Sequence, residues 1–150
     1  MFSMTSRRGA KPVNRLVADA NVLLSAVIGG RARLILDHPD IEEVFVTEAT
    51  LSEVGEYAPS LAARKRLPLD SVLLAMAALP VIVVLPETFS GRVSEANRRM
   101  ARRDPDDVQT LALALQLRIP IWSNDNDFEE ARWKWFSTAQ LLQMLNLTPR

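Results

Sequence analysis

The sequence predicts an α/β domain of three layers, with helices on both faces of a parallel sheet of four or five strands. Three observations lead to this prediction. Short apolar runs alternate with longer amphipathic runs along the chain. Strands that alternate with helices of ten or more residues are joined by right-handed crossovers, which make the strands parallel. Residues 81–85 (VIVVL) are apolar throughout, as expected of a parallel strand that is buried on both faces.

The first half of the chain predicts two strands, each followed by helical sequence. Both strand predictions rest on short runs of β-branched, aromatic or other apolar residues, and the helices on apolar spacing of three and four. The predicted elements are a strand at 15–19, a helix at 20–29 that stops at Gly29-Gly30, a helical piece at 31–38, a strand at 43–47, and a helix at 47–58 capped by Thr47 or Thr50.

The second half continues the alternation. It ends with a helix for which Ser137 or Thr138 is available as the N-cap. The predicted elements are a helix at 68–79, the strand at 81–85, a polar helix at 94–103, a helix at 106–117, a strand at 119–123, a short edge strand within 132–138 and a helix at 137–145.

Composition limits the classes of protein that the chain can represent. Its 150 residues, 48% of them hydrophobic, suit one domain at 14–150, preceded by a tail at 1–13. The absence of cysteine excludes disulfides, thiolate nucleophiles and zinc–cysteine sites. The single histidine, His38, lies where a helix runs into a proline turn, which disfavours a catalytic role. A net charge of zero argues against a strongly cationic nucleic-acid binder, although basic residues can still cluster locally.

Targeting signals are not evident. No segment approaches the ~20 apolar residues of a membrane helix. The N-terminal arginines are not followed by the apolar region of a secretory signal. We therefore expect a cytoplasmic protein that does not associate with membranes.

Carboxylates gather at one edge of the predicted sheet. Asp19 ends the first strand, Glu53 lies in the helix after the second, and the acids of two further stretches, DPDD and SNDND, flank the helix and strand between them. The helix that begins at the DPDD stretch runs away from the carboxyl edge of the sheet, and the strand after it returns to this edge and ends at the SNDND stretch. Both stretches should therefore lie at the carboxyl edge, where parallel sheets bind ligands. These acids are Asp104, Asp106 and Asp107 in the first stretch and Asp125 and Asp127 in the second.

Crowded carboxylates repel one another and raise one another's pKa, so a positive group is needed to hold them together. Hard oxygen ligands without histidine or cysteine suit Mg²⁺ or Mn²⁺. Such ions activate water and clamp phosphate during in-line displacement. The pattern therefore predicts phosphodiester hydrolysis.

Each acid also has an ordinary structural explanation. Asp104, followed by proline and further acids, is typical of a helix start. Asp125 and Asp127 suit a turn, and Glu53 suits an exposed helix face. Asp19 is also able to cap the next helix, although an unpaired charge there would be partly desolvated. The convergence of several acids, rather than any one of them, favours a metal site.

Basic and aromatic residues suggest where a phosphate backbone would lie. Four arginines just before the acids suit phosphate contacts, or else form a solvated face. Trp122, Trp133 and Trp135 are able to stack bases, although core packing is the commoner role. The arginines are Arg98, Arg99, Arg102 and Arg103.

Four stretches of the sequence, VADANVLLSA, TLSEV, DPDDVQTLALAL and IWSNDNDF, resemble in order and spacing the motifs of the PIN-domain family. They are most similar to the VapC-like group of bacterial toxin–antitoxin proteins, over residues 15–147. The resemblance implies four acidic catalytic positions, of which three are also metal ligands, and several supporting residues. The catalytic positions fall on Asp19, Glu53, Asp107 and Asp125, the metal ligands on Asp19, Asp107 and Asp125, and the supporting residues on Asn21, Asp104, Ser123 and Asp127.

The resemblance also implies a Rossmann-like fold, Mg²⁺ or Mn²⁺, ribonuclease activity on RNA, frequent homodimers and a cognate antitoxin. Asp106 adjoins Asp107, so the third acid is open between the two. Two other functions are considered beside the ribonuclease. One is a PIN-fold binding module with little catalysis, which acts through a partner protein. The other is an aspartate-nucleophile phosphatase, but such enzymes need a second aspartate where this chain has Asn21.

Overall fold

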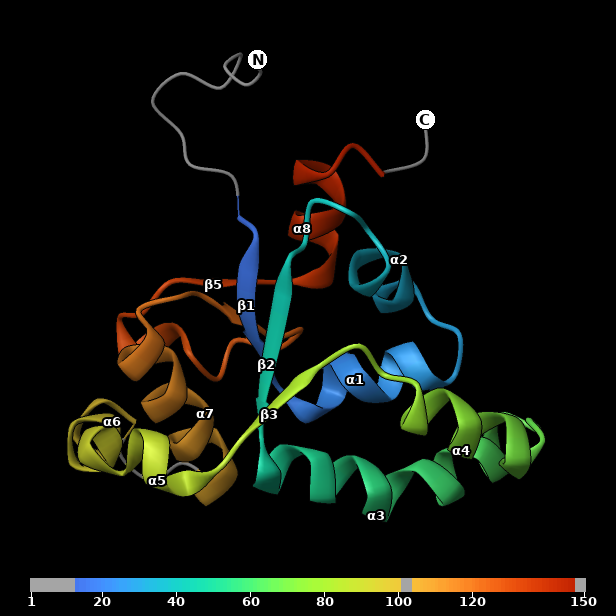
Figure 1. The fold of residues 1–150 in the computed structure, drawn as a ribbon, viewed down its shortest axis with the longest axis horizontal. Helices are drawn as coiled ribbons and strands as arrows, with labels where there is room; N and C mark the ends of the chain where they lie inside the picture. The colour runs from blue at the N-terminus through green and yellow to red at the C-terminus, as the bar shows by residue number, and fades with distance from the viewer. Residues whose placement is uncertain (1–12, 101–103, 148–150) are drawn as a thin grey trace.

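The computed structural model describes residues 13–100 and 104–147, and it confirms the predicted α/β sandwich around a parallel sheet. The sheet has the strand order β3-β2-β1-β4-β5, with every neighbouring pair parallel (Figure 1). The order reverses between β1 and β4, and ligands bind doubly wound sheets at such a switch point. The strands are β1 (Arg15–Ala18), β2 (Glu43–Thr47), β3 (Ile82–Val84), β4 (Ile121–Trp122) and β5 (Trp135–Phe136).

One face of the sheet packs against helices from both ends of the chain. Side chains alternate along a strand, so Leu16 and Ala18 of β1 face these helices while Val17 faces the other side. Trp122 of β4 is fully buried in this first core and donates its indole N–H to Thr138 Oγ1 at 3.0 Å. The helices are α1 (Ala20–Val27), α2 (Ala32–Leu36), α3 (Glu48–Arg64), α4 (Leu69–Ala77) and α8 (Thr138–Met144).

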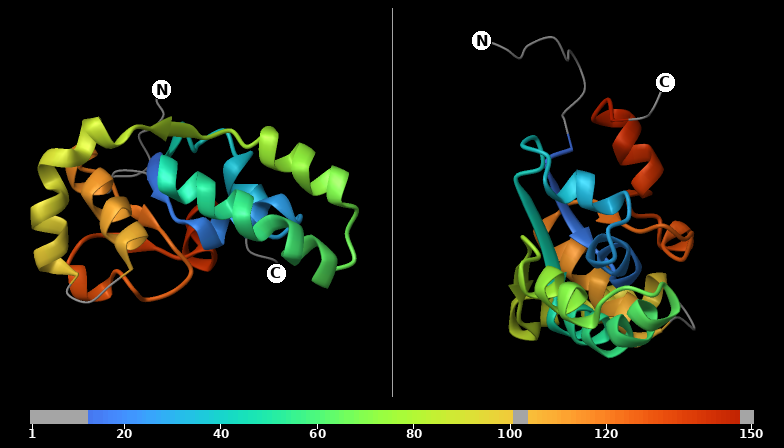
Figure 2. Two further views of the ribbon diagram at one scale, coloured as in Figure 1. Left: turned by 90° about the horizontal axis from the view of Figure 1, so that it is seen from below. Right: turned by 90° about the vertical axis from the view of Figure 1, so that its right-hand side faces the viewer.

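The other face carries α7 (Pro105–Leu117), which packs between the sheet and the short helices α5 (Pro86–Phe89) and α6 (Val93–Arg99) (Figure 2). The helix is buried on nearly all sides, because residues 111–115 (LALAL) are all buried. Two 3-10 turns, Ser90–Arg92 and Glu129–Ala131, complete this layer. The sequence did not predict α5, and the predicted polar helix at 94–103 ends at Arg99, with 101–103 outside the described residues.

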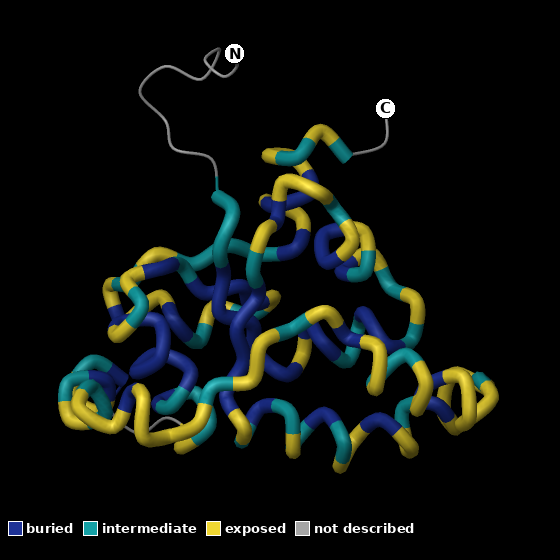
Figure 3. Tube along the Cα trace, viewed as in Figure 1, coloured by how far each residue is buried: buried dark blue, intermediate teal, exposed yellow. Residues whose placement is uncertain are grey.

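The strand at 81–85 was expected to be buried on both faces, and this expectation is wrong. The structure places it as β3 at the edge of the sheet, where Ile82 and Val83 remain 42% and 41% exposed. The strip from α4 through β3 is coloured mainly as exposed or intermediate in Figure 3. An apolar sequence favours a strand here, but the order of strands decides whether helices cover it.

Two further boundaries differ from the sequence prediction. The helix predicted at 47–58 continues as α3 to Arg64, through Pro59, which lies on its exposed side. The predicted tail at 1–13 falls outside the described residues except for Val13, which packs against the first core. Ser137 is confirmed as the N-cap of α8, in a reciprocal pair with Gln140. No helix of the described residues is long and apolar enough to cross a membrane.

Thr47 both ends β2 and caps α3, so its loss should weaken the carboxyl edge of the sheet. Its hydroxyl accepts the backbone N–H of Thr50 at 2.9 Å and lies 3.0 Å from the Thr50 hydroxyl. We expect Thr47→Ala to lower the free energy of unfolding by about 1–2 kcal/mol, as measured by urea denaturation. Ser60→Ala, at an exposed position of the same helix, is the matched control and should change it little. Equal effects of the two variants would contradict the capping role.

Candidate active site

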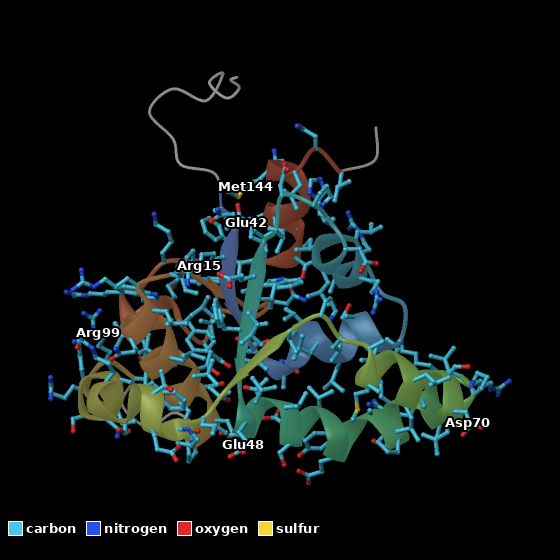
Figure 4. All side chains as sticks on the ribbon, viewed as in Figure 1. Arg15, Glu42, Glu48, Asp70, Arg99 and Met144 are labelled. Carbon is cyan, nitrogen blue, oxygen red and sulfur yellow. The ribbon has the colours of Figure 1, made fainter. Side chains whose placement is uncertain are left out.

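A cavity of about 230 Å³ opens at the carboxyl edge of the sheet, beside the switch point between β1 and β4. Most of its lining residues are carboxylates, and they come from four separate segments of the chain. Glu48, labelled in Figure 4, marks the same edge at the end of β2. The lining residues are Asp19, Ala20, Asn21, Thr50, Glu53, Asp104, Asp106, Asp107, Thr110, Asp125 and Asp127.

Asp19 follows β1 directly and is only 6% exposed. Its backbone N–H donates to the carbonyl of Trp122 at 3.1 Å, which joins the ends of β1 and β4. Its carboxylate accepts the backbone N–H of Val22 at 3.3 Å, so Asp19 is the N-cap of α1. The capping explanation of this residue is therefore correct, yet the same carboxylate also lines the cavity.

The loop after β4 holds Asp125 from three sides. The hydroxyl of Ser123 donates to Asp125 Oδ1 at 3.2 Å, the amide of Asn21 donates to Oδ2 at 3.3 Å, and the backbone N–H of Asp127 donates to Oδ1 at 3.1 Å. Ser123 is fully buried, and its hydroxyl oxygen also accepts the backbone N–H of Asp125 at 3.3 Å. The contact from Asn21 ties the start of α1 to this loop across more than one hundred residues of sequence.

Three further carboxylates come from the start of α7. Asp104 is its N-cap and accepts the backbone N–H of Asp106 at 2.8 Å, and Pro105 occupies the first helical position. Asp106 and Asp107 lie in the first turn, where the helix dipole favours negative charge. The capping explanation is thus correct for Asp104, which nevertheless lines the cavity together with its neighbours.

Two threonines also line the cavity, although no functional motif in the sequence selects them. Thr50 and Thr110 are buried, and their hydroxyl oxygens lie 3.5 Å apart. Thr110 comes one turn after Asp107, on the same face of α7, and this spacing is the signal that would have identified it. The pair joins α3 to α7 below the carboxylates.

Burial and mutual repulsion raise the pKa values of the acids at the centre of the cavity. Burial raises the pKa of Asp19 to about 6, and the negative charge of Asp125 adds to the rise, while hydrogen bonds from Ser123 and Val22 oppose it. Burial raises the pKa of Asp107 to about 7, with further contributions from the charges of Asp127, Asp104, Asp19 and Asp125. No ion pair between described residues involves Asp19, Asp107 or Asp125.

Asp106 and Asp107 differ in the acids that act on them most strongly. Partial burial raises the pKa of Glu53 to about 7, and a hydrogen bond with Asp106 and the Asp106 charge are the next causes, with smaller contributions from Asp104 and Asp107. The pKa of Asp107 is raised by burial and then by the charges of Asp127 and Asp104, with smaller contributions from Asp19 and Asp125. The choice of Asp107 rather than Asp106 as the third acid stays a prediction.

This arrangement predicts different effects for two adjacent substitutions. If Asp107 is the third metal-holding acid, Asp107→Asn should lower Mn²⁺ affinity by about tenfold or more, because charge-assisted ligation is lost. Asp106→Asn should change that affinity less than threefold and instead lower the pKa of Glu53. Calorimetric titration with Mn²⁺ measures the first effect, and carboxyl NMR titration measures the second. A larger loss of affinity in Asp106→Asn would reverse the assignment.

The donor chemistry of the cavity fits a hard divalent cation such as Mg²⁺ or Mn²⁺, since the lining offers carboxylate and hydroxyl oxygens without histidine or cysteine. The side chains are not arranged as a finished coordination sphere. Within residues 13–100 and 104–147, no group of three His, Cys, Asp or Glu side chains has the geometry of a metal site. A bound ion would have to draw the acids inward.

Two of the arginines predicted to contact phosphate are described by the structure, and neither of them lines the cavity. Arg99, labelled in Figure 4, pairs with Glu95 at 3.0 Å and donates to the carbonyl of Ala131 at 3.0 Å. Arg98 is exposed at the end of α6, and Arg102 and Arg103 lie outside the described residues. A role in RNA binding stays a prediction for all four arginines.

His38 lies away from the acids. Its Nδ1 accepts the backbone N–H of Asp40 at 3.0 Å, within the turn that the sequence indicated, and it does not line the cavity. Trp122 is core, as the commoner interpretation holds, while Trp133 and Trp135 are partly buried.

Comparison with solved structures shows the same fold in bacterial proteins. A toxin–antitoxin complex from Klebsiella pneumoniae matches with a TM-score of 0.56 and 18% identity, covering 75% of this chain and 89% of that one. The sarcin-ricin loop cleaving toxin VapC20 of Mycobacterium tuberculosis matches with a TM-score of 0.55 and 18% identity, covering 79% of this chain and 95% of that one. FitAcB of Neisseria gonorrhoeae matches with a TM-score of 0.55 and 18% identity, covering 83% of this chain and 98% of that one.

A search of curated proteins gave no match. The family model described as PIN domain matches residues 17–145, which run from the second half of β1 to the end of α8 and include all the lining residues of the cavity. The chain therefore belongs to the PIN domain family.

Proposed function

We propose that the protein is a Mg²⁺- or Mn²⁺-dependent endoribonuclease and the toxin of a toxin–antitoxin pair. The observation that carries this proposal is the convergence of carboxylates from four chain segments in one cavity at the switch point of the sheet. The raised pKa values of Asp19, Asp107 and Glu53 express the cost of leaving these charges together without a cation. Membership of the PIN domain family supports nuclease activity.

In this proposal Asp19, Asp107 and Asp125 hold the cation, and Asp104 and Asp127 add negative charge around it. When bound, the ion supplies charge for the phosphate and an activated water. Ser123 and Asn21 keep the Asp125 carboxylate oriented through the hydrogen bonds described above. Glu53, with a pKa of about 7, is suited to accept a proton from the attacking water near neutral pH.

The nature of the partners follows from the related structures rather than from this chain. One of them is a toxin–antitoxin complex and another is a toxin that cleaves the sarcin-ricin loop. They support a cognate antitoxin and an RNA substrate for this protein, and we propose a cytoplasmic homodimer as its working form. The alternative is a PIN-fold binding module that acts through a partner protein. The clustered carboxylates argue against it, because a module without catalysis has no need for acids that repel one another.

A cleavage assay on the full chain tests the proposal. Structured RNA is incubated with the protein in Mn²⁺, in Mg²⁺ and in excess EDTA, and the products are resolved by length. Cleavage should require the metal and should be lost in Asp125→Asn, while Asp37→Asn, which removes an acid outside the cavity, should cleave like the wild type. Calorimetry separates the alternatives: absence of Mn²⁺ binding at millimolar metal would favour the binding module.

A further inference from the structure

A second and larger cavity, of about 640 Å³, lies at the opposite edge of the sheet from the carboxylates. It sits at the amino ends of β1, β4 and β5, which are neighbours in the sheet. Arg15, labelled in Figure 4, begins β1 at this edge. Its volume falls in the range of small-molecule sites. The lining residues are Val13, Asn14, Arg15, Arg118, Ile119, Pro120, Trp133 and Lys134.

The charge of this cavity is the reverse of that of the catalytic one. Among the residues that the structure describes, its lining contains three cations and no acid. Arg15 is already paired with Glu43 at 2.9 Å and lies over the ring of Phe45. Arg118 and Lys134 are exposed, and neither forms an ion pair with any of the residues that the structure describes. Two cations are thus available for an anion.

The backbone holds Arg118 at a costly position. It is the C-cap of α7 with φ of 60°, in the left-handed region, where glycine or asparagine is favoured. A residue with a β-carbon is less stable there than glycine. Arg66 and Arg132 have the same backbone conformation, so this position does not by itself mark Arg118 as a binding residue. It does mean that glycine at position 118 removes the side chain without backbone strain.

Trp133 supplies a flat apolar wall beside these cations. Its indole N–H donates to the carbonyl of Ile119 at 2.8 Å, which fixes the orientation of the ring. The ring packs partly on the second core, and its remaining surface lines the cavity next to Pro120. A fixed, partly exposed indole offers a stacking surface for a planar group.

We propose that this cavity binds a nucleoside phosphate, with the base stacked on Trp133 and the phosphate held by Arg118 and Lys134. A planar base beside one indole and an anion beside two unpaired cations match the lining better than an acidic peptide, which would leave the indole without a planar partner. The same chemistry occurs in a free mononucleotide and in one nucleotide of an RNA chain. This site is separate from the carboxylate cavity and does not depend on the proposed function.

Calorimetry on the full chain in EDTA tests the proposal without interference from cleavage or metal. The probes are adenosine monophosphate, adenosine, inorganic phosphate and a 5′-phosphorylated hexaribonucleotide. Adenosine monophosphate should bind with a Kd of about 1 mM or below, and more tightly than adenosine or phosphate alone. Lys134→Gln should weaken its binding about tenfold.

Arg118→Gly distinguishes a binding role from a structural one. The substitution should also weaken binding about tenfold, yet the thermal midpoint of unfolding should not fall, since glycine suits the left-handed position. Trp133→Leu should remove the preference for the nucleotide over inorganic phosphate. Arg64→Gln, which removes an exposed cation at the end of α3, should bind like the wild type.

The hexanucleotide identifies the source of the ligand. Affinity equal to that of adenosine monophosphate indicates a free nucleotide. Binding at least tenfold tighter, which Arg118→Gly reduces about tenfold, indicates an RNA contact, and either result supports the site. The proposal is overturned if neither nucleotide probe binds, if Arg118→Gly and Lys134→Gln bind like the wild type, or if a glutamate-rich peptide binds and the nucleotides do not.

Discussion

Replacing Asp19 by asparagine is expected to lower Mn²⁺-dependent RNA cleavage by about 10³-fold while the protein stays folded. Asp19 is the most deeply buried carboxylate of the cavity, so water is the least able to take the place of its carboxylate after the substitution. Loss of one preorganised charged group at a reacting phosphate costs several kcal/mol of transition-state stabilisation. The fold should survive because asparagine caps a helix about as well as aspartate, and the bond to Val22 can be kept.

The experiment needs both activity and folding measurements. kcat/KM is measured on a short RNA in Mn²⁺, and circular dichroism with urea unfolding is recorded for the same preparation. Asp37→Asn is the matched control, because that exposed residue pairs only with Arg33 on α2. Cleavage by Asp19→Asn within twofold of the wild type would exclude Asp19 from the chemistry.

The metal-free protein is expected to lose stability as the pH rises from about 4 to about 7. Asp19 has a pKa of about 6 in the folded protein against an ordinary value of 3.8, so the folded state holds the proton more tightly. The stabilising contribution is fully present below the unfolded pKa and is lost as pH rises through the folded pKa. Asp19 alone would account for about 2 to 3 kcal/mol, and Asp107 and Glu53, with pKa values of about 7, shift in the same direction.

Saturating Mn²⁺ should remove this loss, because the cation binds the charged form of the acids in the folded state only. Urea unfolding at pH 4 and pH 8, in EDTA and in Mn²⁺, measures all four conditions. In EDTA, Asp19→Asn should be more stable than the wild type at pH 8 and close to it at pH 4, where most of the stabilising contribution of Asp19 is still present. A metal-free wild type that is more stable at pH 8 than at pH 4 would contradict the crowded-carboxylate account.

The sequence predicted the position of most site residues because short-range signals and topology agree there. An apolar run that ends at Asp19, and a helix start at Asp104 followed by a strand that ends at Ser123, are each readable locally. The rule that parallel strands share one carboxyl edge then places these ends together. Only the relation of Asp106 to Glu53 required coordinates, since it depends on which way a first-turn side chain points.

Other features could not be predicted, for physical reasons that differ from case to case. The exposure of β3 depends on strand order, which the apolar sequence of 81–85 does not encode. The contacts of Arg99 with the carbonyls of Ala131 and Arg132 could not be predicted either, because these residues are remote from it along the chain. The second cavity is lined by residues near 14, 119 and 133, and no local sequence pattern predicts that these three segments lie together.

The most direct test of the central claim is a crystal soaked in Mn²⁺, with anomalous density used to locate the ion. The account predicts one or two peaks in the 230 Å³ cavity, with oxygens of Asp19, Asp107 and Asp125 about 2.0–2.6 Å away. Absence of density from this cavity at millimolar Mn²⁺, or carboxylates of Asp19 and Asp125 that point into different regions of solvent, would contradict the claim.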